Sequence, residues 1–279
     1  MNNFFGLPVY TKVSGWSSIL LGILLFAVII AAYLGISYFR HIDNPTDKIV
    51  PSFSQIAQGI ERSLERDTSG NIPLIEDTVA SLRRFGLGVL IGSLIGASLG
   101  VGMGLFPFIE AIFLKLVLYL GKVPPLAILP VIFVFAGIGE NLKIILIALG
   151  ILFPIALDTY LNTHPGSKRG IPAQQLVKAL SLGLKTPVVI WNVVLPQLMP
   201  SILNTIRINL LTAWLFLIAS EAIAADAGLG YRIFLVRRYM AMDIIIPYVF
   251  WIALLSFLFD IILLTIIKKC YTWYQGEER

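Results

Sequence analysis

Six long apolar runs dominate this chain of 279 residues. A helix needs about 20 mostly apolar residues to cross the hydrocarbon core of a bilayer. The runs cover approximately residues 17–39, 85–106, 112–135, 142–160, 203–224 and 244–267. Apolar residues make up 57% of the chain and charged residues only 13%, so a water-soluble fold would expose too much hydrocarbon. The sequence therefore predicts an all-α, polytopic bundle of about six transmembrane helices.

These runs divide the chain into three parts. Residues 1–74 are expected to hold the first transmembrane helix and an extracytoplasmic segment, which is polar and suits short amphipathic helices. Residues 75–267 are expected to form one helical core. Residues 268–279 are expected to form a short tail that begins with Lys268 and Lys269. The first run is too long for the core of a signal peptide, so we expect it to be retained.

One loop indicates the orientation of the chain. The segment 162–187 contains basic residues and no acidic residue. Because Lys and Arg are enriched in cytoplasmic loops, this loop is expected in the cytoplasm. An even number of spans then places both termini in the cytoplasm. The basic residues elsewhere are scattered and form no stripe with aromatic residues, so a nucleic-acid partner is not expected.

The second run carries a glycine at every fourth position. These glycines are Gly88, Gly92, Gly96, Gly100 and Gly104. A helix face without side chains lets another backbone approach closely. The neighbour could belong to the same chain or to a second subunit, and we take packing within the chain as the default.

The third run is interrupted by prolines. Pro124, Pro125 and Pro130 each remove a backbone donor and bend or break a helix. Such breaks are tolerated in a membrane where protein or a water-filled cavity covers the freed backbone groups. The third span is therefore predicted to be broken.

A short amphipathic helix is predicted inside the basic loop. Pro172 suits the first turn of a helix, and Gly183 suits a left-handed residue beyond its end. The apolar positions on one face of this helix are Ala173, Leu176, Val177 and Leu180. A helix of this kind either lies on the membrane surface or docks into a groove of a partner.

The residues after this helix carry a resemblance. Gly183 is followed after nine residues by Val193, Val194, Leu195 and Pro196. This pattern resembles the loop signature of ABC importer permeases, in which Glu-Ala-Ala precedes a glycine and Ile-x-Leu-Pro follows it. The leading triplet departs from that signature, because Val177 stands at the glutamate position and Lys178 at the first alanine, with only Ala179 retained. The departure concerns the role of the glutamate and leaves the docking helix in place.

Three further strings resemble the nitrate, sulfonate, taurine and bicarbonate branch of these permeases. They are Lys122-Val-Pro-Pro-Leu-Ala-Ile-Leu-Pro130, Phe135-Ala-Gly-Ile-Gly-Glu140, and Ala213-Trp214 with Glu221 and Gly228-Leu-Gly-Tyr231. With the loop signature, the resemblance covers about residues 75–267. It implies a type I ABC importer permease fold in a bacterial-type inner membrane.

The resemblance also implies partners and a cargo. The loop helix would bind two cytosolic ABC ATPase subunits, and an extracytoplasmic binding protein would deliver the solute. A second permease subunit is implied, and one set of spans per chain makes a homodimer the simpler arrangement. The cargo would be a small polar solute, typically an anion such as nitrate, sulfonate, taurine or bicarbonate. A urea- or guanidine-like nitrogen compound is the alternative.

One face of the fifth run combines a cation, an indole and an acid. At 100° per residue, its members fall within about 40° of one line. They are Arg207, Leu211, Trp214, Ile218 and Glu221. Because ionisable residues inside spans usually face a bundle interior or an aqueous path, this face is expected to line the translocation path. The alternative is that Arg207 and Glu221 lie near opposite ends of the span and extend to the headgroups.

Lys122 is the other candidate for the translocation path. It shares a helix face with Lys115 and Tyr119, leading to the proline pair. Two cations on one inward face would favour an anionic solute. Lys115 could equally be a residue of the membrane boundary.

No catalytic or cofactor-binding residue is predicted in this chain. It lacks a Gly-x4-Gly-Lys-Ser/Thr phosphate loop, because Gly121-Lys122 is followed by valine. ATP and Mg²⁺ are therefore expected in the partner ATPase. His41 and His164 fall on opposite predicted sides, and Cys270 is the single cysteine, so no metal site is predicted. A membrane-embedded enzyme and a secondary transporter without ATPases are the alternatives from other classes.

Overall fold

The computed structural model describes residues 15–44, 47–67, 70–137 and 139–274 and shows only helices and loops in them. The long helices are α1 (Gly15–Asp43), α3 (Pro73–Leu105), α6 (Glu140–Thr163), α9 (Leu195–Ala224) and α11 (Met242–Cys270). The shorter elements are α2 (Phe53–Leu64), α4 (Pro107–Leu120), η1 (Pro125–Ile128), α5 (Leu129–Ala136), α7 (Ala173–Ser181), α8 (Thr186–Val189), the π turn η2 (Ile190–Val194) and α10 (Leu229–Arg237). The all-helical architecture predicted from the sequence is confirmed for this part of the chain.

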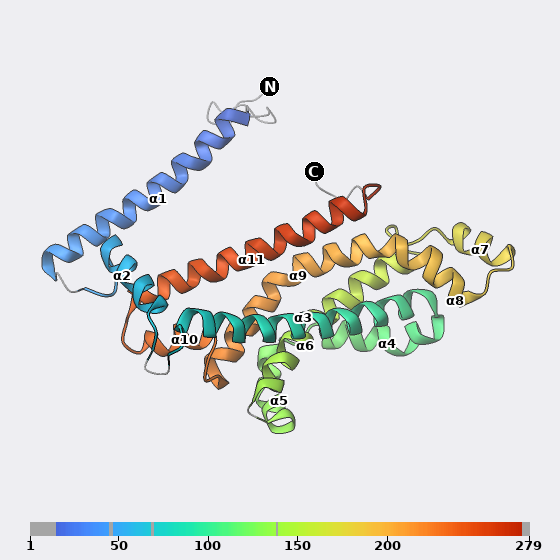
Figure 1. Ribbon diagram of the computed structural model, residues 1–279. Helices are drawn as coiled ribbons and strands as arrows, with labels where there is room; N and C mark the ends of the chain where they lie inside the picture. Colours follow the sequence, from blue (N-terminus) through green and yellow to red (C-terminus); the bar gives the residue numbers. More distant parts are fainter. Residues whose placement is uncertain (1–14, 45–46, 68–69, 138, 275–279) are drawn as a thin grey trace.

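Five of the described helices are long and apolar enough to cross a membrane. A sixth crossing is obtained if the bent pair Pro107–Leu120 and Pro125–Ile132 counts as one span, and these two segments meet at 88°. The predicted break in the third span is confirmed. It falls beside Pro124 and Pro125, and α5 projects away from the long axis of the bundle (Figure 1). The helix α3 starts at Pro73, so the predicted boundary after residue 74 falls inside its first turn.

The glycine-bearing face of α3 packs against α6 of the same chain. A Cβ atom added at Gly92 would lie 2.7 Å from the carbonyl oxygen of Ala148, and one added at Gly100 would lie 2.5 Å from that of Ala156. Side chains cannot be accommodated at such distances. The default of packing within the chain is therefore confirmed.

Gly92→Ala is expected to lower the thermal stability of the protein. The added methyl group would press on the backbone of α6, and overpacking of this kind typically costs about 1–3 kcal/mol. Gly86→Ala is the matched control, because a Cβ atom at Gly86 would meet nothing within 4 Å. Thermal unfolding of both purified variants in one detergent measures the difference. Equal unfolding temperatures would contradict the proposed close contact.

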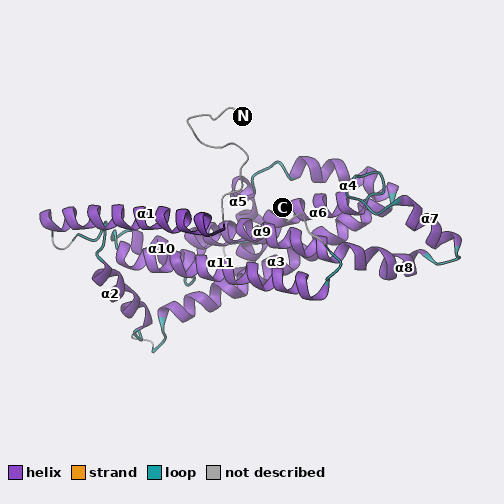
Figure 2. Cartoon of the chain, turned by 90° about the horizontal axis from the view of Figure 1, so that it is seen from above, coloured by secondary structure: helices purple, strands orange, loops and turns teal. Residues whose placement is uncertain are grey.

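The main core lies where α3, α6, α9 and α11 meet. Phe85 of α3 stacks on Trp214 of α9, with ring centroids 4.4 Å apart, and Phe259 of α11 packs against both rings. Leu146 and Ile147 of α6 are fully buried beside them. Figures 1 and 2 show these long helices running together along one axis.

The N-terminal helices differ in how they are held. None of the apolar window of α1 is buried inside the chain, and α1 stands away from the other long helices in Figure 1. By contrast, α2 packs on the start of α11: a Cβ atom at Gly59 would lie 2.1 Å from the Asp243 carbonyl oxygen, and Arg62 pairs with the Asp243 carboxylate at 3.3 Å. Short amphipathic helices were expected between the first two spans, and the described residues there hold one, α2. The helix α10, in the connection before the last span, was not predicted.

Candidate functional site

The loop helix predicted from the sequence is α7, at the end of the bundle opposite to α2 and α10 (Figure 1). Pro172 is its N-cap residue, one position earlier than predicted. Gly183 has a φ angle of +81°, and its backbone N–H donates to the Leu180 carbonyl at 3.0 Å. The left-handed end expected at Gly183 is confirmed, because glycine adopts this conformation without a steric cost.

The apolar positions of α7 differ in how far they are buried. Ala179 is buried, and Leu176 is partly buried against the same apolar cluster. Val177 and Leu180 are 65% and 51% exposed, and Ala173 and Lys178 are exposed as well. The predicted amphipathic helix is therefore confirmed, and its apolar positions differ in burial: Leu176 packs against the chain, whereas Val177 and Leu180 stay exposed. The adjoining Leu182 is also 73% exposed.

The anchoring cluster connects α7 to two long helices. Its buried members are Ile171, Ala179, Val189, Val194, Leu198 and Ile202. Leu105 and Val101 of α3 pack against it, as does Val193 at the end of the signature. Leu195 and Pro196 form the first turn of α9. The end of the signature thus lies where the loop joins α9, and a force on α7 would reach both α9 and α3 through packed side chains.

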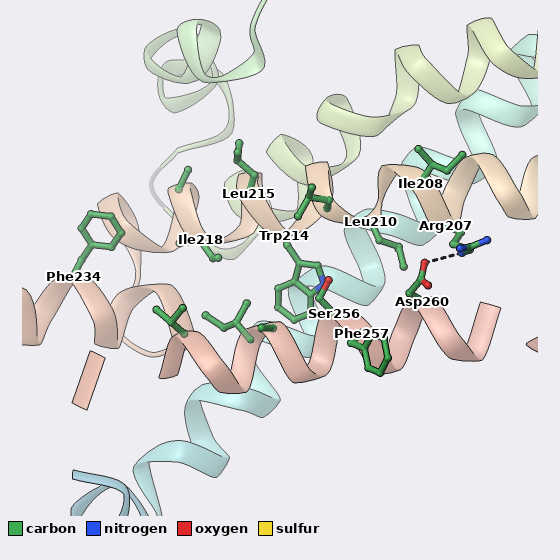
Figure 3. Close-up of a pocket in the computed structure, with 15 residues that line it drawn as sticks. Arg207, Ile208, Leu210, Trp214, Leu215, Ile218, Phe234, Ser256, Phe257 and Asp260 are labelled. Atoms are coloured by element: carbon green, nitrogen blue, oxygen red, sulfur yellow. Dashed lines mark hydrogen bonds and ion pairs between the residues drawn. The ribbon is translucent and has the colours of Figure 1, made fainter. Parts of the chain in front are cut away.

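A mostly apolar groove of about 840 Å³ runs between α9, α10 and α11 (Figure 3). Arg207, Leu211, Trp214 and Ile218 line it, as one face of the fifth span was expected to do. At one end, the Arg207 Nε atom donates to the Asp260 carboxylate at 2.7 Å. Trp214 is only 2% exposed, and its indole Nε1 has no hydrogen-bond partner among the described residues.

Glu221 does not belong to this groove. Its side chain is fully buried, and its carboxylate accepts hydrogen bonds from Ser81 Oγ at 2.7 Å, from Arg84 Nη1 at 2.6 Å and from the Gly230 N–H at 2.8 Å. Two expectations are therefore corrected. Glu221 neither lines the face with Arg207 nor extends to the headgroups, because α3 and the start of α10 enclose it.

Arg84 stands at the centre of a cluster near the end of the bundle opposite to α7. Its Nε and Nη2 atoms both bond to the Glu140 carboxylate, at 2.7 and 2.8 Å, while Nη1 reaches Glu221 and the Ala227 carbonyl. Lys143 Nζ also donates to Glu140, at 2.6 Å. This cluster joins α3, α6, α9 and the corner before α10.

A second buried carboxylate fixes the same corner. The fully buried Asp77 accepts hydrogen bonds from the Gly228 N–H at 2.8 Å, from Arg232 Nε at 2.8 Å and from the Tyr248 hydroxyl at 3.0 Å. Burial alone would lower the pKa of Arg232, but the Asp77 carboxylate raises it above the ordinary value. Gly228 has a φ angle of +138°, and a Cβ atom there would lie 2.5 Å from Glu221.

The last predicted position, Lys122, lies apart from these features. Lys122 is exposed in the bend between α4 and η1 and does not line the groove. Asp158 of α6 pairs with Thr205 and lies 3.9 Å from Arg169 of the basic loop. Among the described residues, no group of three or more His, Cys, Asp or Glu side chains could hold a metal ion.

Sequence reasoning missed Asp77, Ser81 and Arg84, because all three precede the apolar run of their helix. Their spacing of four and three residues was the available signal. It puts three polar side chains on one face of a helix, which indicates a common polar partner. That partner, the corner around Gly228, lies about 150 residues away in the sequence, as the Gly228–Asp77 bond spans 151 residues.

Known proteins resemble this chain at three levels. Residues 88–269 match the family described as binding-protein-dependent transport system inner membrane component. The chain is 34% identical over 204 residues to the taurine transport system permease protein TauC of Escherichia coli (strain K12), with 73% of this chain and 72% of TauC covered. It is 30% identical over 269 residues to SsuC of Bacillus subtilis (strain 168), named for transport of aliphatic sulfonates, with 95% and 90% covered.

The fold also has a solved counterpart. A chain of the MetNI methionine ABC transporter, solved in inward-facing conformations, superposes with a TM-score of 0.58 at 20% sequence identity. The match covers 72% of this chain and 98% of that one. At this identity the likeness concerns the fold, and it confirms the permease architecture expected for the core.

Proposed function

This chain belongs to the family of binding-protein-dependent transport system inner membrane components, and from that premise we propose that it carries a small oxyanion of the sulfonate type in an ATP-driven importer. It is a transport permease and a multi-pass inner-membrane protein. The observation that carries the proposal is the match to TauC and SsuC together with the outward apolar face of α7. Nitrate and bicarbonate carry the same negative charge and are the alternative anions for this cargo.

The outward face of α7 is the proposed docking site for the ATPase subunits. Val177, Leu180 and Leu182 are large apolar side chains that are more than half exposed. An apolar helix face of this kind is well suited to a hydrophobic groove on a partner. The ATPase would supply the ATP and Mg²⁺ sites, and Lys178 at the edge of the face would remain in water.

Coupling would run from α7 into the bundle. Closure of the ATPase subunits around ATP would move α7, and the packed cluster that holds Leu176 would carry this movement to α9 and α3. Packed interiors transmit displacement because they have few voids. The bundle would then open alternately toward the binding protein and toward the cytoplasm.

The face with the groove is the proposed contact with a second permease subunit. Arg207 and Asp260 lie within membrane spans, and their side chains are 22% and 40% exposed in the isolated chain. Charged side chains inside spans almost always face protein or water. A second copy would cover this face, and Arg207, Leu211 and Trp214 would border the translocation path between the copies.

The proposed orientation follows from the basic loop. With α7 in the cytoplasm, α2, α10 and the Arg84 cluster lie on the outer side, where a binding protein would deliver the solute. Both termini would be cytoplasmic. Residues 1–14 and 275–279 lie outside the described residues, and the tail predicted from residue 268 is described only to residue 274.

Uptake of radiolabelled taurine by cells tests this function. Deleting the gene for this chain is expected to reduce uptake to the level of energy-depleted cells, and expression from a plasmid is expected to restore it. Uptake should follow the cellular ATP level and persist when an ionophore collapses the membrane potential. Uptake that stops with the membrane potential while ATP remains would contradict an ATP-driven importer. The same assay with labelled methanesulfonate extends the test to a simpler sulfonate.

A further inference from the structure

The Arg84 guanidinium presents one edge to a fixed partner and the other edge to an exposed one. Its Nη1 atom is held by the fully buried Glu221 and by the Ala227 carbonyl. Its Nε and Nη2 atoms form two parallel bonds to Glu140, whose side chain is 55% exposed. Such a planar pair of donors matches carboxylate and other oxyanions. Glu221 therefore fixes Arg84 so that its second edge points toward the surface.

Lys143 adds a second buried cation to this edge. Its side chain is 3% exposed, and Nζ donates to Glu140 Oε1 at 2.6 Å. An ammonium group has three donors, and Glu140 is its only side-chain partner within the described part of the chain. A buried cation with so few partners needs an anion at this position, since unpaired buried charges are strongly unfavourable.

The start of α6 reinforces this preference. Glu140 is its first residue, and the N-cap Gly139 supplies no side-chain bond to the free backbone N–H groups of the first turn. These groups and the aligned peptide dipoles favour a negative charge at the N-terminus of a helix. The guanidinium and the ammonium thus meet at one exposed carboxylate, which belongs to the first residue of a helix.

We propose that Arg84 and Lys143 form an oxyanion-binding site at the outer end of the bundle, and that the Glu140 carboxylate occupies it in this conformation. The two cations are balanced here by Glu140 and Glu221. When Glu140 rotates into solvent, one positive charge is left without a partner, and a bound monoanion restores the balance. A sulfonate offers the same paired oxygens to Arg84 as a carboxylate does.

This inference deepens the proposed function and rests on it. The site lies on the outer side in the proposed orientation, where it would receive the anion from the binding protein. Displacement of Glu140 would link arrival of the anion to a change at the start of α6. Glu221 acts here as a positioning residue, because it holds the guanidinium and does not meet the anion.

Anion-dependent thermal unfolding of the purified full chain tests the site, with methanesulfonate as the probe and chloride at equal ionic strength as the reference. Glu140→Ala removes the carboxylate that competes for the site. Its unfolding temperature is expected to rise by about 3–5 °C when methanesulfonate is present at about ten times its dissociation constant. The unfolding temperature of the wild-type chain should rise by less than about 1 °C under the same conditions. Glu76→Ala, which removes an exposed glutamate of α3, should behave as the wild type does.

Two further variants keep the test decisive. Glu140→Gln keeps the side-chain shape without the charge, so it should also gain stability from methanesulfonate if Glu140→Ala folds poorly. Adding Lys143→Met to either variant should abolish the gain. The proposed site would be overturned if methanesulfonate raised the unfolding temperature of neither Glu140 variant, or if the rise were equally large after Lys143→Met was added. The assay needs neither ATPase nor uptake, so its failure is distinguishable from failure of the importer function.

Discussion

Glu221→Ala is expected to prevent this protein from accumulating in a folded form. The substitution leaves Arg84 buried without its inner partner and leaves the hydroxyl of Ser81 and the Gly230 N–H with one acceptor fewer. Removing one partner of a buried ion pair typically costs about 3–5 kcal/mol. Native proteins have little stability to spare, because their net folding free energies are about 5–15 kcal/mol. The yield of monodisperse protein and its thermal unfolding measure the effect.

Two controls identify the cause of the loss. Glu61→Ala removes an exposed glutamate of α2 and should leave the yield unchanged. Glu221→Gln can still accept hydrogen bonds from its neighbours, so it should be less harmful than Glu221→Ala. If Glu221→Ala unfolded within about 1 °C of the wild-type protein, the buried cluster around Arg84 would not hold these ends of the helices together.

The double variant Val177→Asp with Leu180→Asp is expected to stop solute uptake without unfolding the protein. Both side chains are more than half exposed, so the isolated chain should tolerate the change. A carboxylate buried in an apolar interface is strongly unfavourable, and we expect ATPase affinity to fall by at least about 100-fold, which corresponds to about 2.7 kcal/mol. ATP-dependent taurine uptake and the yield of the folded chain are measured together.

Gln175→Asp is the matched control for this variant. It adds a carboxylate to the same helix, about 160° around the axis from Val177 at 100° per residue. Uptake should be retained in this control. Leu176→Asp should instead reduce the yield, because Leu176 packs against the cluster that anchors α7. Normal uptake by the double variant would exclude the outward face of α7 as the docking surface.

Features that depend only on residues close together in the sequence were predictable. Apolar runs located the spans, since a bilayer requires long apolar helices whatever packs against them in the fold. The regular spacing of Gly92 and its equivalents indicated close packing, and Gly183 indicated a left-handed end. Pro124 and Pro125 indicated the broken span, because the lost backbone donors follow directly from the residue type.

Features that depend on residues far apart in the sequence were not predictable. Helical periodicity put Glu221 within about 40° of Arg207, but it could not show what surrounds each end of α9. Arg207 meets Asp260 of α11, whereas Glu221 meets residues of α3 that lie 137 and 140 positions earlier. Likewise, periodicity grouped Leu176 with Val177 and Leu180, but it could not show that Leu176 packs against the chain while the other two stay exposed. Tertiary packing decided both cases.

Purification of the tagged chain from its native host in a mild detergent, with quantitative mass spectrometry of the proteins that remain bound, tests the central claim most directly. We predict that a P-loop ATPase remains bound in a fixed ratio to the wild-type chain and is lost from the Val177→Asp, Leu180→Asp double variant. A chain that repeatedly purifies without any ATPase, or an ATPase that the double variant retains in full, would contradict this account.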